Sequence, residues 1–75
     1  MKARYLIQEC KGNTANPFDY VTLEGAHTKA QAVQTETEYR AAFGMSNTRV
    51  IEQTKYLAER REYNRAAFAN ALNNS

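Results

Sequence analysis

The stretch from Thr28 to Gly44, TKAQAVQTETEYRAAFG, predicts one helix with a marked start and a marked end. Thr28 and Gln31 have the spacing of a capping box, in which each side chain satisfies a backbone N–H group at the helix start. Gly44 stands where a left-handed residue is favoured, because glycine has no Cβ atom to clash. An amphipathic helix of this length needs a surface to cover. We therefore expect the flanking segments to form a sheet beneath it.

Two short strands are predicted before this helix. Residues 3–10, ARYLIQEC, alternate in a pattern typical of a strand with one better-buried face. Residues 11–17, KGNTANP, are rich in residues that tolerate turn dihedrals and predict a loop. Residues 18–24, FDYVTLE, contain the aromatic and β-branched residues that strands favour. The seven-residue connection suits a hairpin with a loose tip.

Residues 49–57, RVIEQTKYL, fit either a strand or the first turns of a long helix. Glu, Gln, Lys and Leu favour helix, whereas the Val50–Ile51 pair and Thr54 favour strand. A two-stranded hairpin is marginal in water, and a third strand would widen the sheet. A helix beginning near Thr48 would also place Arg49 against the helix dipole. We therefore predict a third strand over residues 48–55.

A second helix is predicted over residues 58–72, where Ala, Glu and Arg predominate. Phe68, Ala71 and Leu72 share one side, so the last two turns can dock. The sequence leaves open whether this helix packs on its own sheet. The whole chain, residues 1–75, then forms a single small α+β domain of order ββαβα with a mostly antiparallel three-stranded sheet. The alternative is ββαα with a long C-terminal helix. The predicted core consists of Tyr5 or Leu6, Ile7, Val21, Leu23, Val50, Tyr39 and Phe43.

The composition indicates a folded protein in a reducing compartment. The chain has 75 residues, of which 43% are hydrophobic and 24% charged, and it carries a net charge of +2. It contains no apolar run near 18 residues, and the brief apolar patch near the N-terminus is broken by Gln8 and Glu9, so neither a membrane span nor a signal peptide is predicted. A single cysteine cannot form an internal disulfide. We therefore expect a cytoplasmic location without membrane contact.

Residues with catalytic or metal-binding chemistry are sparse. His27 is the only histidine, and Cys10 has no predicted base beside it, so a capping histidine and a structural thiol are expected. Glu36 and Glu38 lie two residues apart and point to different faces of a helix. The three glycines fit no phosphate-loop spacing. We therefore predict a protein that is not an enzyme, with no catalytic, cofactor or metal site.

The positive charge is concentrated in the C-terminal third. Residues 1–47 carry five basic and five acidic side chains, whereas residues 48–75 carry five basic and three acidic ones. Arginine and tyrosine, which are common at binding hot spots, alternate there in the sequence YLAERREYNR. The predicted partner-binding residues are Tyr56, Arg60, Arg61, Tyr63 and Arg65. A solvated helix surface with intrahelical pairs such as Glu62–Arg65 is the plainer interpretation.

The order strand, strand, capped helix and a strand reading TRVIE resembles many short phage-encoded accessory proteins. These include small inhibitors of host RNA polymerase and some anti-CRISPR proteins. The similar segment, residues 20–53, covers a little under half of the chain. The helix from Ala58 departs from the simplest members, so no binding residue is carried over. The resemblance implies a small binder in the host cytoplasm, often an inhibitor of a host nucleic-acid machine.

The expected function is therefore a small, non-enzymatic, intracellular protein-binding module that acts as an inhibitor or modulator. One alternative is a DNA- or RNA-binding protein that uses the basic C-terminal helix, although Glu59 and Glu62 would repel phosphates. Another is a self-associating structural protein with that helix as its dimer interface. The sequence leaves open whether the chain is a monomer or a dimer.

Overall fold

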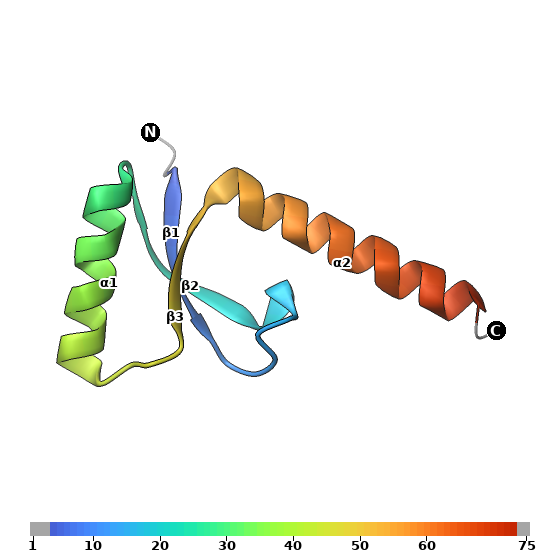
Figure 1. Cartoon of the computed structure of the whole chain (residues 1–75), viewed down its shortest axis with the longest axis horizontal. Coiled ribbons are helices and arrows are strands. Elements are labelled where there is room, and N and C mark those ends of the chain that lie inside the picture. The colour runs from blue at the N-terminus through green and yellow to red at the C-terminus, as the bar shows by residue number, and fades with distance from the viewer. Residues whose placement is uncertain (1–3, 74–75) are drawn as a thin grey trace.

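The computed structural model describes residues 4–73 and has the predicted order ββαβα (Figure 1). Its elements are β1 (Tyr5–Cys10), the 3-10 turn η1 (Pro17–Asp19), β2 (Tyr20–Ala26), α1 (Lys29–Phe43), β3 (Thr48–Glu52) and α2 (Gln53–Asn73). Residue 3, where the first strand was predicted to begin, and residues 74–75 at the C-terminus lie outside the described range. The predicted small α+β class is confirmed.

The strands form one open sheet in the order β2-β1-β3, and β1 pairs antiparallel with both neighbours. The N-terminal strand is therefore the central one. α1 covers one face of this sheet, while α2 leaves the end of β3 on the other side and projects away from the body (Figure 1). Successive side chains of a strand point to opposite faces. Tyr5 and Ile7 therefore face α1, and Leu6 and Gln8 face the side of α2.

Both predicted caps of α1 are present. The Thr28 hydroxyl accepts a hydrogen bond from the backbone N–H of Gln31 at 3.2 Å. Gly44 has a φ of 64° and donates its N–H to the carbonyl oxygen of Arg40 at 2.9 Å. These local contacts explain why the helix begins and ends at its predicted residues.

Polar side chains tie the second half of α1 to β3. The Nε of Arg40 donates to the Thr48 hydroxyl at 2.7 Å, and that hydroxyl donates to Oε2 of Glu36 at 3.0 Å. Arg40 and Glu36 also form an ion pair, at 3.9 Å. The Thr48 hydroxyl at the start of β3 therefore accepts a hydrogen bond from one residue of α1 and donates one to another. These two bonds hold the start of β3 against α1.

The core between α1 and the sheet is small. Ile7 and Ala32 are fully buried, and Ala26 is 9% exposed. Tyr5, Leu23, Tyr39 and Val50 are half-buried against them, as predicted. Two predicted core residues are wrong, because Val21 is 47% exposed and Phe43 is 69% exposed. Val21 is near the start of β2, and Phe43 is the last residue of α1. Both therefore lie at the edge of the small core.

The second strand begins two residues later than predicted. Residues 17–19 form η1 because the Asn16 side chain accepts from the backbone N–H of Phe18 at 2.9 Å, and Pro17 suits the first position of such a turn. A β-bulge also falls in β2, where Ile7 pairs with Glu24 and Gln8 pairs with Thr22. The extra residue, Leu23, packs against the core, and the strand continues to Ala26 rather than Glu24.

The third strand is present but shorter than predicted, and α2 begins five residues earlier. β3 stops at Glu52, so residues 53–55 are helical rather than extended. The N–H of Gln53 still donates to the carbonyl of Arg4, and no strand partner is paired with the chain beyond this point among the described residues. Without a ladder, the helical preference of Gln, Lys and Leu decides the conformation. The structure thus combines the third strand with the long C-terminal helix of the alternative.

Replacement of Ile7 by Ala should lower the free energy of unfolding by about 2–4 kcal/mol, because it leaves a cavity at the centre of a small core. Val21→Ala, on the neighbouring strand but half exposed, should cost less than about 1 kcal/mol. Urea unfolding followed by circular dichroism measures both changes. Similar losses for the two variants would contradict the core described here.

Candidate interaction surface on the C-terminal helix

The face of the sheet opposite α1 is polar at its centre. Gln8 lies on the central strand and is fully buried. Its Nε2 donates to the Thr22 hydroxyl at 3.1 Å, and its Oε1 accepts from Nε of Arg49 at 2.9 Å. A buried amide without such partners would be costly, so these contacts on β2 and β3 allow a glutamine at this position.

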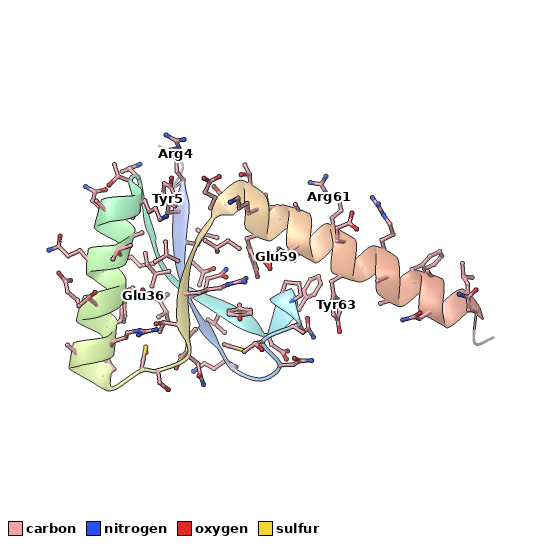
Figure 2. The ribbon with its side chains drawn as sticks, in the orientation of Figure 1. Arg4, Tyr5, Glu36, Glu59, Arg61 and Tyr63 are labelled. Atoms are coloured by element: carbon pink, nitrogen blue, oxygen red, sulfur yellow. The ribbon has the colours of Figure 1, made fainter. Side chains whose placement is uncertain are left out.

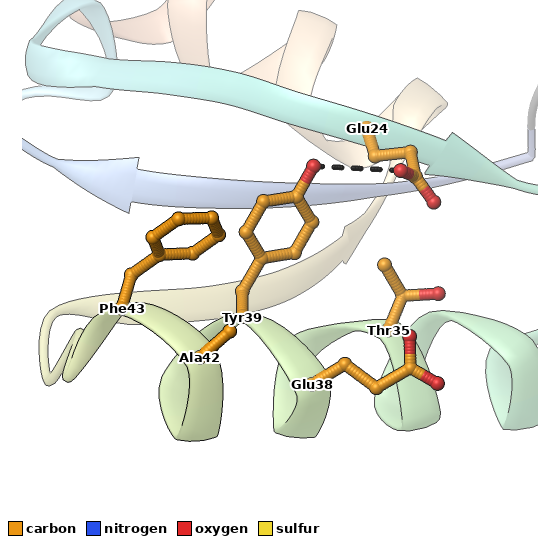
Figure 3. Close-up of a pocket in the computed structure, with 6 residues that line it drawn as sticks. All are labelled: Glu24, Thr35, Glu38, Tyr39, Ala42 and Phe43. Atoms are coloured by element: carbon orange, nitrogen blue, oxygen red, sulfur yellow. Dashed lines mark hydrogen bonds between the residues drawn. The ribbon is translucent and has the colours of Figure 1, made fainter.

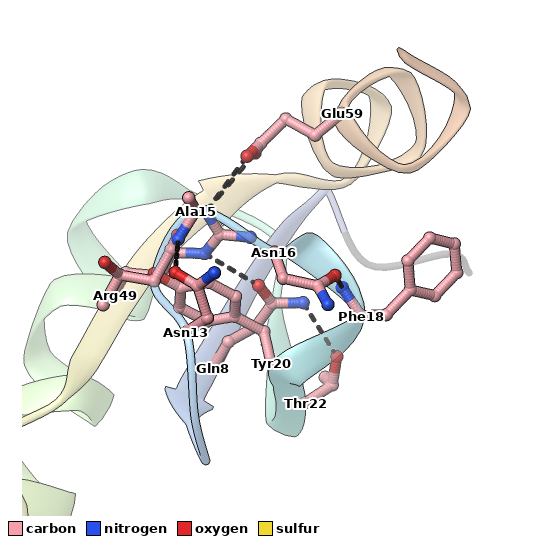
Figure 4. A network of polar contacts seen from close by, with 10 residues as sticks. Gln8, Asn13, Ala15, Asn16, Phe18, Tyr20, Thr22, Arg49 and Glu59 are labelled. Carbon is pink, nitrogen blue, oxygen red and sulfur yellow. Dashed lines mark hydrogen bonds and ion pairs between the residues drawn. The ribbon is translucent and has the colours of Figure 1, made fainter. Parts of the chain in front are cut away.

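Arg49 extends this polar centre toward α2 (Figure 4). Its guanidinium carbon lies 3.6 Å from the ring centre of Tyr20 and 5.8 Å from that of Tyr56. Its Nη1 also forms an ion pair with Glu59 at 3.2 Å. One arginine side chain therefore contacts β1, β2 and α2 at once. No local sequence pattern indicates this role, because Arg49 is separated from Gln8 by 41 positions.

A second arginine continues the same arrangement along α2. The guanidinium carbon of Arg60 lies 4.8 Å from the ring centre of Phe18 and 5.6 Å from that of Tyr56. The rings of Phe18 and Tyr63 meet edge to face, with centres 6.0 Å apart. Cations over ring faces are attracted by the ring quadrupole. We call this alternating set the arginine–aromatic stack, and its members are Tyr20, Arg49, Tyr56, Arg60, Phe18 and Tyr63.

The stack fastens the first three turns of α2 to η1 and the sheet. Nη2 of Arg49 and Nε of Arg60 are buried without a hydrogen bond in the described structure, so the ring faces are the main electrostatic partners of these atoms. No residue of α2 is fully buried, and the helix contacts mainly η1 and β3. The stack therefore takes the place of an apolar core on this side of the sheet.

The structure divides the five predicted partner-binding residues into two groups. Tyr56 and Arg60 are half-buried within the stack, and Tyr63, although 39% exposed, rests against Phe18. Arg61 and Arg65 are exposed. Figure 2 shows Arg61 and Tyr63 pointing to opposite sides of α2. Arg65 forms an ion pair with Glu62 of the same helix at 3.1 Å.

The distal half of α2 projects beyond the body, and every described residue from Arg61 onward is exposed (Figure 1). The sequence left open whether the last two turns pack on the sheet, and the structure leaves Phe68 67% exposed and Leu72 60% exposed. Phe18 of η1 contacts Tyr63, and α2 continues for ten residues beyond this contact. No helix within residues 4–73 is long and apolar enough to cross a membrane.

The exposed apolar residues of α2 form a stripe together with the exposed arginines. At about 100° per residue, this stripe is centred about 130° from the side chains of the stack. Leu57, which is 44% exposed, begins it, and Leu72 ends it. We call it the outer stripe, and its members are Leu57, Arg61, Asn64, Arg65, Phe68 and Leu72. Its position opposite η1 agrees with the direction of Arg61 in Figure 2.

A second candidate surface lies beside the C-terminal half of α1 (Figure 3). An open hollow of about 320 Å³ is lined by Glu24, Thr35, Glu38, Tyr39, Ala42 and Phe43. The Tyr39 hydroxyl donates to Glu24 at 3.4 Å, and the rings of Tyr39 and Phe43 lie 5.9 Å apart. The lining is therefore an apolar shelf, formed by Tyr39, Ala42 and Phe43, with the carboxylates of Glu24 and Glu38 at its edges.

The remaining reactive side chains have structural surroundings. Cys10 is 7% exposed, and its thiol lies 3.3 Å from the carbonyl oxygen of Gly12, to which it can donate. His27 is exposed at the turn before α1. Within residues 4–73, no group of three or more histidine, cysteine, aspartate or glutamate side chains is placed to hold a metal ion.

The stack predicts an asymmetry between two arginine-to-lysine changes. Arg49→Lys keeps the charge but loses the planar group that lies over Tyr20 and Tyr56, so it should lower the free energy of unfolding by about 1–3 kcal/mol. Arg61→Lys, on the exposed side of the same helix, should change it by less than about 0.5 kcal/mol. Thermal and urea unfolding measure both. Equal effects would show that the stack does not stabilise the fold.

The role of this surface cannot be inferred from similar proteins. Comparisons with protein-family models, with curated protein sequences and with solved structures gave no match to this chain. The function must therefore be argued from the outer stripe, the arginine–aromatic stack and the hollow beside α1. Of these three surfaces, the outer stripe has the most large apolar side chains that are exposed, namely Leu57, Phe68 and Leu72, whereas the hollow beside α1 has Phe43.

Proposed function

We propose that this chain is a non-enzymatic protein-binding module that presents the outer stripe of α2 to its partner. The observation that carries the proposal is the exposure of Phe68 and Leu57 beside Arg61 on a helix that projects from the body. Arginine and large aromatic residues are enriched at protein interfaces. An apolar stripe edged by charge is a common recognition element when a helix lies in the groove of a partner.

The energetics of α2 support the same proposal. Helical segments shorter than about 12–15 residues are marginal in water, and most helices in proteins depend on the packing of one face. Residues 64–73 continue the helix for ten residues beyond the last contact of the stack at Tyr63. Every residue in these turns is exposed, and Phe68 is 67% exposed. Binding of a partner along the outer stripe would supply that packing and bury the exposed apolar side chains.

Direct nucleic-acid binding is a weaker candidate. Sequence-independent binding of single strands uses basic side chains together with aromatic rings on which bases stack. The rings of Tyr56 and Tyr63 are engaged by Arg60 and Phe18 within the stack. Arg65 is paired with Glu62, whose carboxylate would repel a phosphate. The exposed part of α2 therefore offers two arginines but no tyrosine platform beside them.

The test is capture of partners from a lysate by the tagged chain, with and without nuclease, followed by measured binding to the partner that is retained. Arg61→Glu/Arg65→Glu should remain folded, because exposed charges contribute little to stability. It should weaken binding at least tenfold, which corresponds to about 1.4 kcal/mol. Arg60 is left unchanged because it belongs to the stack.

The matched control is Lys29→Glu/Lys55→Glu, which makes the same change in net charge with two exposed lysines outside the outer stripe. It should bind as the unmodified chain does. Loss of the partner after nuclease treatment would favour the nucleic-acid alternative. Equal binding by the Arg61/Arg65 variant and the control would place the binding surface elsewhere, with the hollow beside α1 as the next candidate.

A further inference from the structure

We propose that the partner of the outer stripe is a second copy of this chain, whose α2 lies antiparallel along the first. This inference rests on the proposed function and specifies the partner of the same surface. It begins from a symmetry in the spacing of the stripe. The midpoint between Asn64 and Arg65 is also the midpoint between Arg61 and Phe68 and between Leu57 and Leu72.

A two-fold interface requires that residue i contacts residue j of the partner whenever j contacts i. An antiparallel pair of helices centred between Asn64 and Arg65 meets this requirement. Leu57 of each copy then lies opposite Leu72 of the other copy. The exposed apolar ends of one stripe then cover those of the other, over a helix length of about 22 Å.

The polar members of the stripe are also matched in this arrangement. Arg61 lies opposite Phe68 of the other copy, so its guanidinium can cover an exposed ring. The chain already uses this contact, since the Arg60 guanidinium lies 4.8 Å from the ring centre of Phe18. Asn64 lies opposite Arg65, and its side-chain oxygen can accept a hydrogen bond from that guanidinium. A polar residue in a helix interface also fixes register, which disfavours shifted pairings.

The shape of the molecule leaves room for the second helix. The described chain measures 46 × 28 × 14 Å by its Cα atoms, and its long dimension follows the projection of α2 (Figure 1). Arg61 points away from η1 and the sheet, so the outer stripe faces the side that the body does not cover (Figure 2). In an antiparallel pair, the two bodies lie at opposite ends of the paired helices.

The effect of salt distinguishes a second copy of this chain from an acidic protein or a nucleic acid as the partner. Two copies of a chain with net charge +2 repel each other, and the outer stripe itself carries Arg61 and Arg65. Added salt screens this repulsion, so self-association through apolar contacts should strengthen as salt is raised. Binding of an acidic protein or a nucleic acid to the same arginines should weaken instead. The sign of the salt dependence therefore separates the possible partners.

The experiment is sedimentation equilibrium of the full chain at about 1 μM to about 1 mM, a range suited to an interface at the small end of the usual size classes. We expect a monomer–dimer equilibrium that shifts toward dimer at higher salt. Phe68→Glu should raise the dissociation constant at least tenfold. The matched control is Phe43→Glu, which changes an equally exposed phenylalanine at the end of α1 and should leave the equilibrium unchanged.

Orientation is tested with a spin label on Lys55→Cys in a chain whose Cys10 is replaced by serine. Lys55 is exposed and lies away from the outer stripe. In the antiparallel pair the two labels are separated by 19 helical positions, about 28 Å along the axis. In a parallel, in-register pair the axial offset is absent, so the labels lie much closer. Pulsed electron–electron double resonance measures the distance between the two labels and so distinguishes the two arrangements.

Four results would overturn the inference: a monomer throughout the concentration range, a dimer that persists in Phe68→Glu, a dimer that weakens with salt, or labels at the short parallel distance. Circular dichroism of Phe68→Glu confirms that the variant is folded before its association is judged. A monomeric chain whose Arg61/Arg65 variant loses a captured protein would leave the protein-binding proposal standing. A dimer that Phe68→Glu disrupts and Phe43→Glu leaves intact would support both the protein-binding proposal and the two-fold pairing.

Discussion

The contacts of Arg49 are the interaction on which the arrangement of this molecule depends. One guanidinium lies over Tyr20, donates a hydrogen bond to the side-chain oxygen of the buried Gln8, and reaches Glu59 and Tyr56 on α2. It is the point at which the sheet and the C-terminal helix are joined. The stack built around it uses planar, weakly hydrated groups that cover rings well. The direction in which α2 leaves the body follows from this junction.

The two faces of the sheet are therefore stabilised in different ways. α1 covers one face through a small apolar core centred on Ile7 and Ala32. A chain of this length has few large apolar residues with which to build a second core. The other face instead combines the buried amide of Gln8 with arginines held between rings. Its stability depends on directional contacts, so it tolerates changes of residue type less well than an apolar surface would.

The outer part of α2 extends beyond the arginine–aromatic stack. The stack occupies one side of the first three turns and ends at Tyr63, while the helix continues to Asn73. The outer stripe lies on the side of α2 to which Arg61 points, and its large apolar side chains are 44% to 67% exposed. Exposed apolar side chains beside arginines on a projecting helix are the basis of the proposed protein-binding surface.

The sequence by itself determined α1, because Thr28 and Gly44 act through contacts within a few residues. It also determined the alternation of β1, but residues 49–57 fitted a helix as well as a strand, so the third strand needed a tertiary argument. Only the tertiary structure decided where β2 and β3 end, that Leu23 lies in a bulge, and that Arg60 and Tyr56 serve the fold while Arg61 and Arg65 remain exposed. The physical reason is the range of the contacts: the stack joins residues of η1, β2, β3 and α2 that no local pattern brings together.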